Sequence, residues 1–247
     1  MPRRVERSDP LVTRIEPLRP RGLRVRIHLD RGDPIEVSLE ALERSRLGVG
    51  DPLASNRRHH LLNDDADIQV REAALSLLSW RARTRAELRR RLISKGFRPA
   101  RVDPCLERLQ EKGLLDDAAV SAAFVRDRLR HRPRGRARLS SELRAKGVDP
   151  AVAQRAVDRV LTEEELTDTA LAHRAAQDWL ARQSAGVLRT LASDERHAAR
   201  ERARRRLYGY LARRGFRGQA LTQALDAALR RARDAIESGE DGGRDGR

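Results

Sequence analysis

Arginine is the residue type in this sequence whose chemistry stands out first. Its guanidinium group stays charged at neutral pH and donates several hydrogen bonds from a planar fork, which suits phosphate oxygens. The segment 131–138 places arginines on alternate residues around Pro133 and Gly135, and a solvated basic loop explains that segment equally well. The residues expected to contact a partner or DNA are Arg81, Arg83, Arg85, Arg89, Arg132, Arg134, Arg136, Arg138, Arg204, Arg205, Arg206, Arg213, Arg214 and Arg217.

The sequence matches no catalytic or metal-binding pattern. It has no phosphate-binding loop and no His-Glu-x-x-His motif, and Gly48-Val-Gly50 lacks the third glycine of a dinucleotide fingerprint because Leu53 stands there. The pair His59 and His60 has no further ligands nearby, so a solvated loop explains it better than a metal site. The sequence therefore predicts a binding protein with no cofactor and no metal, and not an enzyme.

The elements that would carry the arginines follow a threefold repeat. Each copy has two leucines four residues apart, which lie on one helical face, then a glycine that suits the left-handed residue after a helix. An apolar residue follows that glycine. The aligned positions are Leu88, Leu92, Gly96 and Phe97, then Leu139, Leu143, Gly147 and Val148, then Leu207, Leu211, Gly215 and Phe216.

Each copy also has a helical pattern before and after this stretch. We therefore predict a mainly α protein: a curved, elongated tandem array of three three-helix repeats, preceded by a small antiparallel β subdomain. Thr84 with Glu87 is expected to cap the middle helix of the first repeat, which carries Leu88 and Leu92. Residues 193–195 are expected to cap a long helix ending at Arg214. The expected repeats are 66–117, 118–165 and 166–232, the last with an insertion near 183–201.

The two ends of the chain differ from the repeats. Alternating apolar residues at 12–15, 23–29 and 35–37 predict strands, with a turn at 30–33 and a short helix capped by Ser38. Such a subdomain is small enough to need docking or dimerisation. Residues 1–65 thus form the β-rich subdomain with a linker at 54–66, whereas 1–10 and the tail 233–247 are predicted to be disordered.

Charge and composition narrow the class of partner. The formal net charge is +16, and the basic excess lies in the three repeats. This favours a polyanion such as nucleic acid over the alternative of arginine-rich codon usage. The lone Cys105 indicates a reducing cytoplasm and a small buried residue, and no apolar run is long enough to span a membrane. The few aromatic residues are expected to pack in or beside the core, namely Trp80, Phe124, Trp179, Tyr208 and Tyr210, although the tyrosines could also stack on bases.

With the repeats in place, the chain resembles the RecX family of regulatory proteins. The resemblance covers about residues 66–232 and rests on motifs that occur in a fixed order on the repeats. These are 83–88 leading to Lys95-Gly-Phe97, Gly113-Leu-Leu-Asp-Asp117, 135–139 leading to Lys146-Gly-Val148, and 206–216 with its Arg-Arg-Gly-Phe end.

The resemblance implies a monomeric regulator that lodges in the groove of the RecA recombinase filament on single-stranded DNA. It implies suppression of that filament's ATP hydrolysis and strand exchange, in DNA repair, recombination and control of the SOS response. The alternative is a basic helix-turn-helix-like protein that acts on DNA directly. The threefold repeat argues against that alternative, since a helix-turn-helix protein needs one reading unit and a dimer seam.

Overall fold

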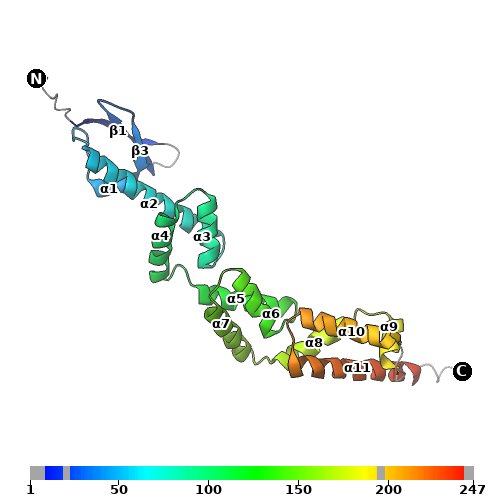
Figure 1. Ribbon diagram of the computed structural model, residues 1–247. Coiled ribbons are helices and arrows are strands. Elements are labelled where there is room, and N and C mark those ends of the chain that lie inside the picture. Colours follow the sequence, from blue (N-terminus) through cyan, green and yellow to red (C-terminus); the bar gives the residue numbers. More distant parts are fainter. Residues whose placement is uncertain (1–8, 19–22, 194–197, 242–247) are drawn as a thin grey trace, which may run out of the picture. The chain divides into compact units, whose positions relative to one another are not determined.

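The computed structural model describes residues 9–18, 23–193 and 198–241, and the side chains up to residue 236 (Figure 1). The chain divides into two compact units. The first contains the chain up to residue 82 together with 88–115, and the second contains 83–87 and the chain from residue 116 onward. We describe each unit by itself.

The first unit begins with the predicted antiparallel sheet. Strands β1 (Val12–Leu18), β2 (Arg24–Leu29) and β3 (Ile35–Ser38) pair in sequence order, with Ile27 opposite Ile15 and Ile35. The period-two pattern is confirmed, because Val25 and Ile27 are buried while their neighbours Arg24 and Arg26 are not. Helix α1 (Leu39–Ser45) follows, and the Ser38 hydroxyl accepts a hydrogen bond from the Ala41 amide as its cap.

The linker predicted at 54–66 is wrong, because helix α2 runs without a break over Ser55–Trp80. Most of its polar residues are exposed or partly exposed, while Leu61 and Ile68 pack into the core under the sheet. The carboxylate of Asp65 is also buried: it accepts a hydrogen bond from the Ser38 amide at 2.6 Å and from Arg24 at 3.3 Å. A polar composition thus concealed an amphipathic helix that supports the sheet.

Helices α3 (Arg85–Ser94) and α4 (Pro99–Glu111) complete the first repeat. Leu88 and Leu92 are fully buried and form a core with Val102, Leu106 and other residues of α4, and with Val70 of α2. Cys105 belongs to the same core, as the sequence predicted.

The second unit contains seven helices in the part of the chain that the structure describes. Repeat two consists of α5 (Asp117–His131), α6 (Arg136–Ala145) and α7 (Pro150–Glu163), and repeat three contains α8 (Asp168–Leu180), α9 (Ala185–Ala192), α10 (Ala198–Arg213) and α11 (Gly218–Asp241). The repeat is confirmed by its glycines, since Gly96, Gly147 and Gly215 have φ of 92°, 85° and 87°. Only a residue without a β-carbon adopts this region at low cost.

Repeat three differs from the prediction in two places. The insertion at 183–201 contains a helix of its own, α9, which packs through Leu191 on the common core, while the cap predicted at 193–195 includes residues outside those described. The disordered tail predicted at 233–247 is wrong for 233–241, because α11 continues to Asp241. That segment lacked an apolar periodicity, but Arg, Ala and Glu residues, which favour helices, continue α11 there. The predicted disorder at 1–10 falls largely on residues outside those described.

The aromatic side chains fall into two groups, one buried or partly buried and one exposed. Trp179 has an exposed fraction of 9%, and Phe124 and Tyr210 are partly buried against the core of the second unit, as predicted. Trp80 is 84% exposed and Tyr208 is 52% exposed, so the expectation that these two pack in or beside the core is wrong. Trp80 is the last residue of α2, beyond the turns that the core covers.

Candidate nucleic-acid interface

An exposed row of arginines lies on α10 of the second unit. These residues and two aromatic side chains line a hollow of about 610 Å³. Helix α10 can present cations on this side because Ala203, Leu207 and Leu211 are buried on the other. The lining residues are Trp179, Arg202, Arg205, Arg206, Tyr210 and Arg213.

Two further hollows continue this surface along α6. One of about 410 Å³ lies between α6 and the residues that end α10, and one of about 560 Å³ lies between α6 and the start of α7. Arg217 lines both of these hollows. Arg213 lines the 410 Å³ hollow and also the hollow on α10, so the two are adjacent. We call this surface the arginine groove and define it by Arg136, Arg138, Arg144, Arg202, Arg205, Arg206, Arg213 and Arg217.

Carboxylates pair with two of the three arginines that α6 contributes to the arginine groove, Arg136 and Arg138. Arg136 pairs with Asp158, and its Nε lies 3.9 Å from Asp168. Arg138 donates its Nε–H to Glu142 at 2.7 Å. An arginine already held by a carboxylate gains less from a phosphate, because the first pair must be broken.

Glu142 is the centre of this paired cluster. Besides Arg138, its carboxylate accepts from Arg134 and, at 3.4 Å, from Arg128. Burial alone would raise the pKa of Glu142, but the hydrogen bonds and charges of Arg138 and Arg134 hold it below its ordinary value. Glu142 is therefore ionised at neutral pH and fixes these arginines in place.

The α10 part of the arginine groove differs in its electrostatics. Across the ranges 9–18, 23–193 and 198–236, no carboxylate pairs with Arg202, Arg205, Arg206, Arg213 or Arg217, and all five are exposed. Four of them lie on α10 and Arg217 lies between α10 and α11. Unpaired exposed cations gathered in this way neutralise a phosphate backbone by releasing its counterions. This part of the surface can therefore bind a polyanion without first breaking ion pairs.

Arg214 has a different role from its neighbours. Its guanidinium lies over the Tyr210 ring, 4.5 Å from the ring centroid, and donates to the Pro133 carbonyl at 3.0 Å. Partial burial lowers the pKa of Arg214, and the nearby charges of Arg132 and other arginines act in the same direction. An arginine remains charged even so, and Arg214 thus adds positive potential while it packs repeat three against repeat two.

Two glycines set the distance between α6 and the end of α10. The Gly135 amide donates to the Arg214 carbonyl at 2.9 Å, and a β-carbon built on Gly135 would lie 2.6 Å from the Gly215 carbonyl oxygen. A β-carbon on Gly215 would in turn lie 2.5 Å from the Arg138 amide. Arg138 and Arg213 line one hollow beside this close approach.

The same kind of junction precedes α6 and α3. Asp168 accepts from the Arg136 amide at 3.2 Å, and Asp117 accepts from the Arg85 amide at 2.7 Å. In each case an acidic residue at the start of one repeat caps the middle helix of the repeat before it. Thr84 adds a hydrogen bond to the Lys146 carbonyl at 3.1 Å and accepts from the Glu87 amide, so the predicted cap at Thr84 is confirmed.

The expected arginines are therefore distributed over several environments. Arg81 is exposed and Arg89 pairs with Asp103 at 2.6 Å, and both belong to the first unit. Arg83 and Arg85 belong to the second unit but do not line the arginine groove. Arg132, Arg134 and Arg214 lie beside it, whereas Arg204 lies outside it, 3.8 Å from Glu201. Those within the groove are Arg136, Arg138, Arg205, Arg206, Arg213 and Arg217.

Two groove residues were missing from the expected set, Arg144 and Arg202. Arg202 lies one helical turn before Arg206, so helical spacing would have identified it. Among the described residues, no group of three or more His, Cys, Asp or Glu side chains could hold a metal ion, and no helix is long and apolar enough to cross a membrane.

Known proteins are similar to this chain in sequence and in fold. Residues 71–109 match the domain described as "RecX, first three-helix domain" and 116–157 match "RecX, second three-helix domain". A "Regulatory protein RecX" of Pelodictyon phaeoclathratiforme is 36% identical over 152 residues, which are 62% of this chain and 84% of that relative. The chain belongs to the RecX family of regulatory proteins.

Other RecX proteins agree with this assignment. The regulatory protein RecX of Halorhodospira halophila is 37% identical over 64% of this chain and 88% of its own, and that of Mycolicibacterium vanbaalenii is 36% identical over 67% and 85%. A crystal structure of regulatory protein RecX superposes with a TM-score of 0.66 over 88% of this chain and 99% of its own, at 22% identity. That of RecX from Lactobacillus salivarius gives 0.50 over 67% and 97%, at 19% identity, and both likenesses show the fold.

Proposed function

We propose that this RecX family member binds the RecA recombinase filament on single-stranded DNA and lowers its ATPase and strand exchange. It would act without catalysis of its own, in the cytoplasm, during DNA repair and recombination and in control of the SOS response. Family membership supports a regulatory role. The observation that carries the nucleic-acid part is the α10 side of the arginine groove, where five exposed arginines have no carboxylate partner in the described residues.

The charge distribution supports a partner that already contains DNA. The paired arginines around Glu142 are fixed side chains that suit a preformed surface, whereas the unpaired arginines on α10 suit phosphates. A filament offers both a protein surface and a phosphate backbone. Bare DNA would use the unpaired part alone.

Order of addition tests this proposal. Preassembled filament is mixed with the protein at amounts too small to cover the DNA, and DNA-dependent ATP hydrolysis is followed. We expect the rate to fall. A protein that merely coats DNA inhibits only when it is added before the recombinase, in proportion to DNA concentration.

Matched variants connect that assay to the arginine groove. Replacing Arg202, Arg205 and Arg206 with Gln should weaken inhibition of the preassembled filament. Replacing Arg155, Arg174 and Arg230 removes the same charge from exposed positions of the same unit outside the groove, and should leave inhibition unchanged. Full ATPase activity of the preassembled filament, together with tight binding to bare DNA, would favour the direct DNA-binding alternative.

A further inference from the structure

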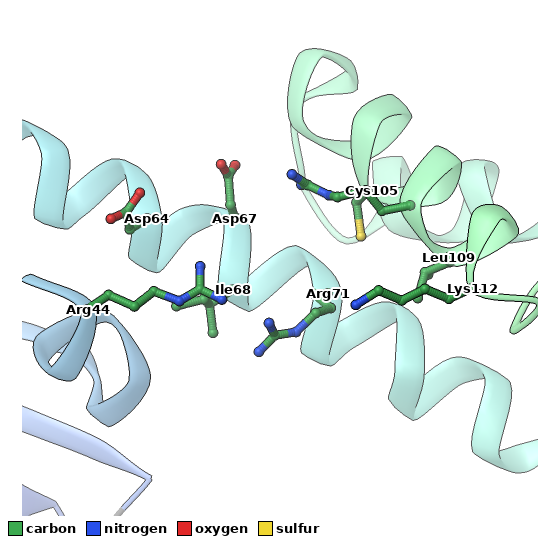
Figure 2. A pocket seen from close by; sticks show the side chains of 9 residues that line it. Arg44, Asp64, Asp67, Ile68, Arg71, Cys105, Leu109 and Lys112 are labelled. Carbon is green, nitrogen blue, oxygen red and sulfur yellow. The ribbon is translucent and has the colours of Figure 1, made fainter.

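We propose that the first unit contains a separate binding site for a small phosphorylated molecule, of the size of a mononucleotide. A cavity of about 280 Å³ lies between α1, the middle of α2 and the second half of α4 (Figure 2). All of its lining residues belong to the first unit, whereas the arginine groove belongs to the second. They are Arg44, Asp64, Asp67, Ile68, Arg71, Cys105, Arg108, Leu109 and Lys112.

Cations outnumber carboxylates in and around this cavity. Arg44 and Arg71 share one carboxylate, Glu40, with Nη–Oε distances of 2.6 Å from Arg44 and 2.9 Å from Arg71. Arg101 pairs with Asp67 at 2.7 Å.

Arg108 of α4 and Lys112, the residue that caps the end of α4, lack such pairing. Within the described ranges, the side chains of Arg108 and Lys112 form no hydrogen bond or ion pair, and both are exposed at the rim. Among the side chains that line the cavity, four are cationic and two are carboxylates. The excess of two positive charges matches a phosphate monoester, which carries nearly two negative charges at neutral pH.

The cavity also has an apolar wall. Ile68, Cys105 and Leu109 are all less than 4% exposed and line its inner side. Burial raises the pKa of the Cys105 thiol, so the group is neutral and acts as part of this wall. Figure 2 shows the Cys105 sulfur extending from α4 toward α2. Such a wall suits the ring of a ligand whose phosphate lies at the cationic rim.

Asp64 and Asp67 decide between a discrete ligand and a nucleic-acid backbone. Both lie on α2 at one edge of the cavity (Figure 2). A continuous phosphate backbone that crossed the cavity would meet these carboxylates and be repelled. A small molecule can instead direct a hydroxyl or amino group to Asp64, whose side chain has no hydrogen-bond partner in the described chain.

Calorimetry on the full chain tests the site with AMP, inorganic pyrophosphate and a short oligothymidylate as probes. We expect AMP to bind, and the double variant Arg108→Gln, Lys112→Gln to lower its affinity at least about ten-fold, because two charge-assisted contacts are lost. The control is Lys95→Gln, Arg98→Gln, which removes the same charge from exposed positions of the same unit outside the cavity. Circular dichroism verifies that each variant is folded.

Three results would overturn the proposal. One is the absence of binding by both AMP and pyrophosphate. Another is an equal loss of affinity in the control variant, which would indicate a general charge effect. The third is tighter binding of the oligothymidylate than of AMP with dependence on Arg108 and Lys112, which would assign the cavity to nucleic acid.

A second variant tests the acceptor role of Asp64. Asp64→Asn should weaken AMP binding several-fold, because the amide is a poorer acceptor, while pyrophosphate binding stays equal or improves as a negative charge is removed. A loss of affinity for both ligands would contradict the placement of the phosphate away from Asp64.

Discussion

A β-carbon on Gly135 would lie 2.6 Å from the carbonyl oxygen of Gly215, so the second and third repeats approach closely at these two residues. The amide of Gly135 uses this approach to donate to the Arg214 carbonyl. The contact is therefore both a steric limit and a hydrogen-bonded junction.

Gly135→Ala should destabilise the protein. Gly135 has φ of −76°, which alanine adopts freely, so the cost is the clash with the Gly215 backbone, about 1–3 kcal/mol. Urea unfolding measures it. Gly186→Ala is the control, because that β-carbon would be 4.0 Å from the Ser184 hydroxyl, an ordinary contact, and should not lower stability. A Gly135→Ala variant as stable as the natural protein would disprove the close junction.

Asp65→Ala should cost about 3 kcal/mol, because it leaves the buried Ser38 amide and Arg24 without their carboxylate partner. The adjacent Asp64 provides the control, since its side chain forms no hydrogen bond in the described residues and Asp64→Ala should change stability by less than about 0.5 kcal/mol. Thermal melts of the two variants compare them directly. Equal melting temperatures would mean that Asp65 does not join the sheet to α2.

The contrast between these two aspartates shows where the sequence was informative. The repeats were predictable because leucines and glycines at fixed spacing report helix faces and helix ends directly. The role of Asp65 was not predictable, because it depends on the contact between β3 and α2. The sequence alone does not distinguish a buried aspartate from an exposed one. The linker prediction for the first part of α2 failed for a different reason: the apolar residues of this part are spaced widely among polar ones.

The sequence allowed us to predict which arginines cluster at the candidate interface, but not which of them pair with carboxylates. The sequence identified Arg134, Arg136 and Arg138 as a basic cluster, but the carboxylates that hold them come from Glu142, Asp158 and Asp168. Two of these lie on later helices, so only the folded chain brings them to the arginines. The unpaired arginines of α10 have no such partners in the described part of the chain.

The salt dependence of single-stranded DNA binding should separate these two groups. Replacing Arg202, Arg205 and Arg206 with Gln should flatten the slope of log K against log salt by about 2, from roughly 0.7 for each phosphate contact. A second variant replaces four arginines with Gln, namely Arg132, Arg134, Arg136 and Arg138. It removes one more charge but should flatten the slope less, because carboxylates hold three of these residues. A larger effect of the quartet would place the phosphate contacts before and on α6.

Glu142 should make stability depend on pH. Its folded pKa lies below the ordinary value, so its pairs stabilise the fold above about pH 4.3 and this contribution is lost as the pH falls through the folded pKa. Denaturant unfolding from about pH 6 down to pH 3 should therefore show a steeper loss in the natural protein than in Glu142→Gln. Parallel curves would contradict the role of Glu142 as the ionised centre of the cluster.

One consequence follows from the unbroken course of α2. Its N-terminal part supplies Leu61 and Ile68 to the core under the sheet, and the turns from Val70 onward supply Val70 and Ala74 to the core of the first repeat. Because neighbouring turns of one helix belong to both cores, melting of either removes a wall of the other. The β subdomain and the first repeat should then unfold as a single cooperative foldon, with amides of β2 and α4 exchanging hydrogen at the same free energy of opening.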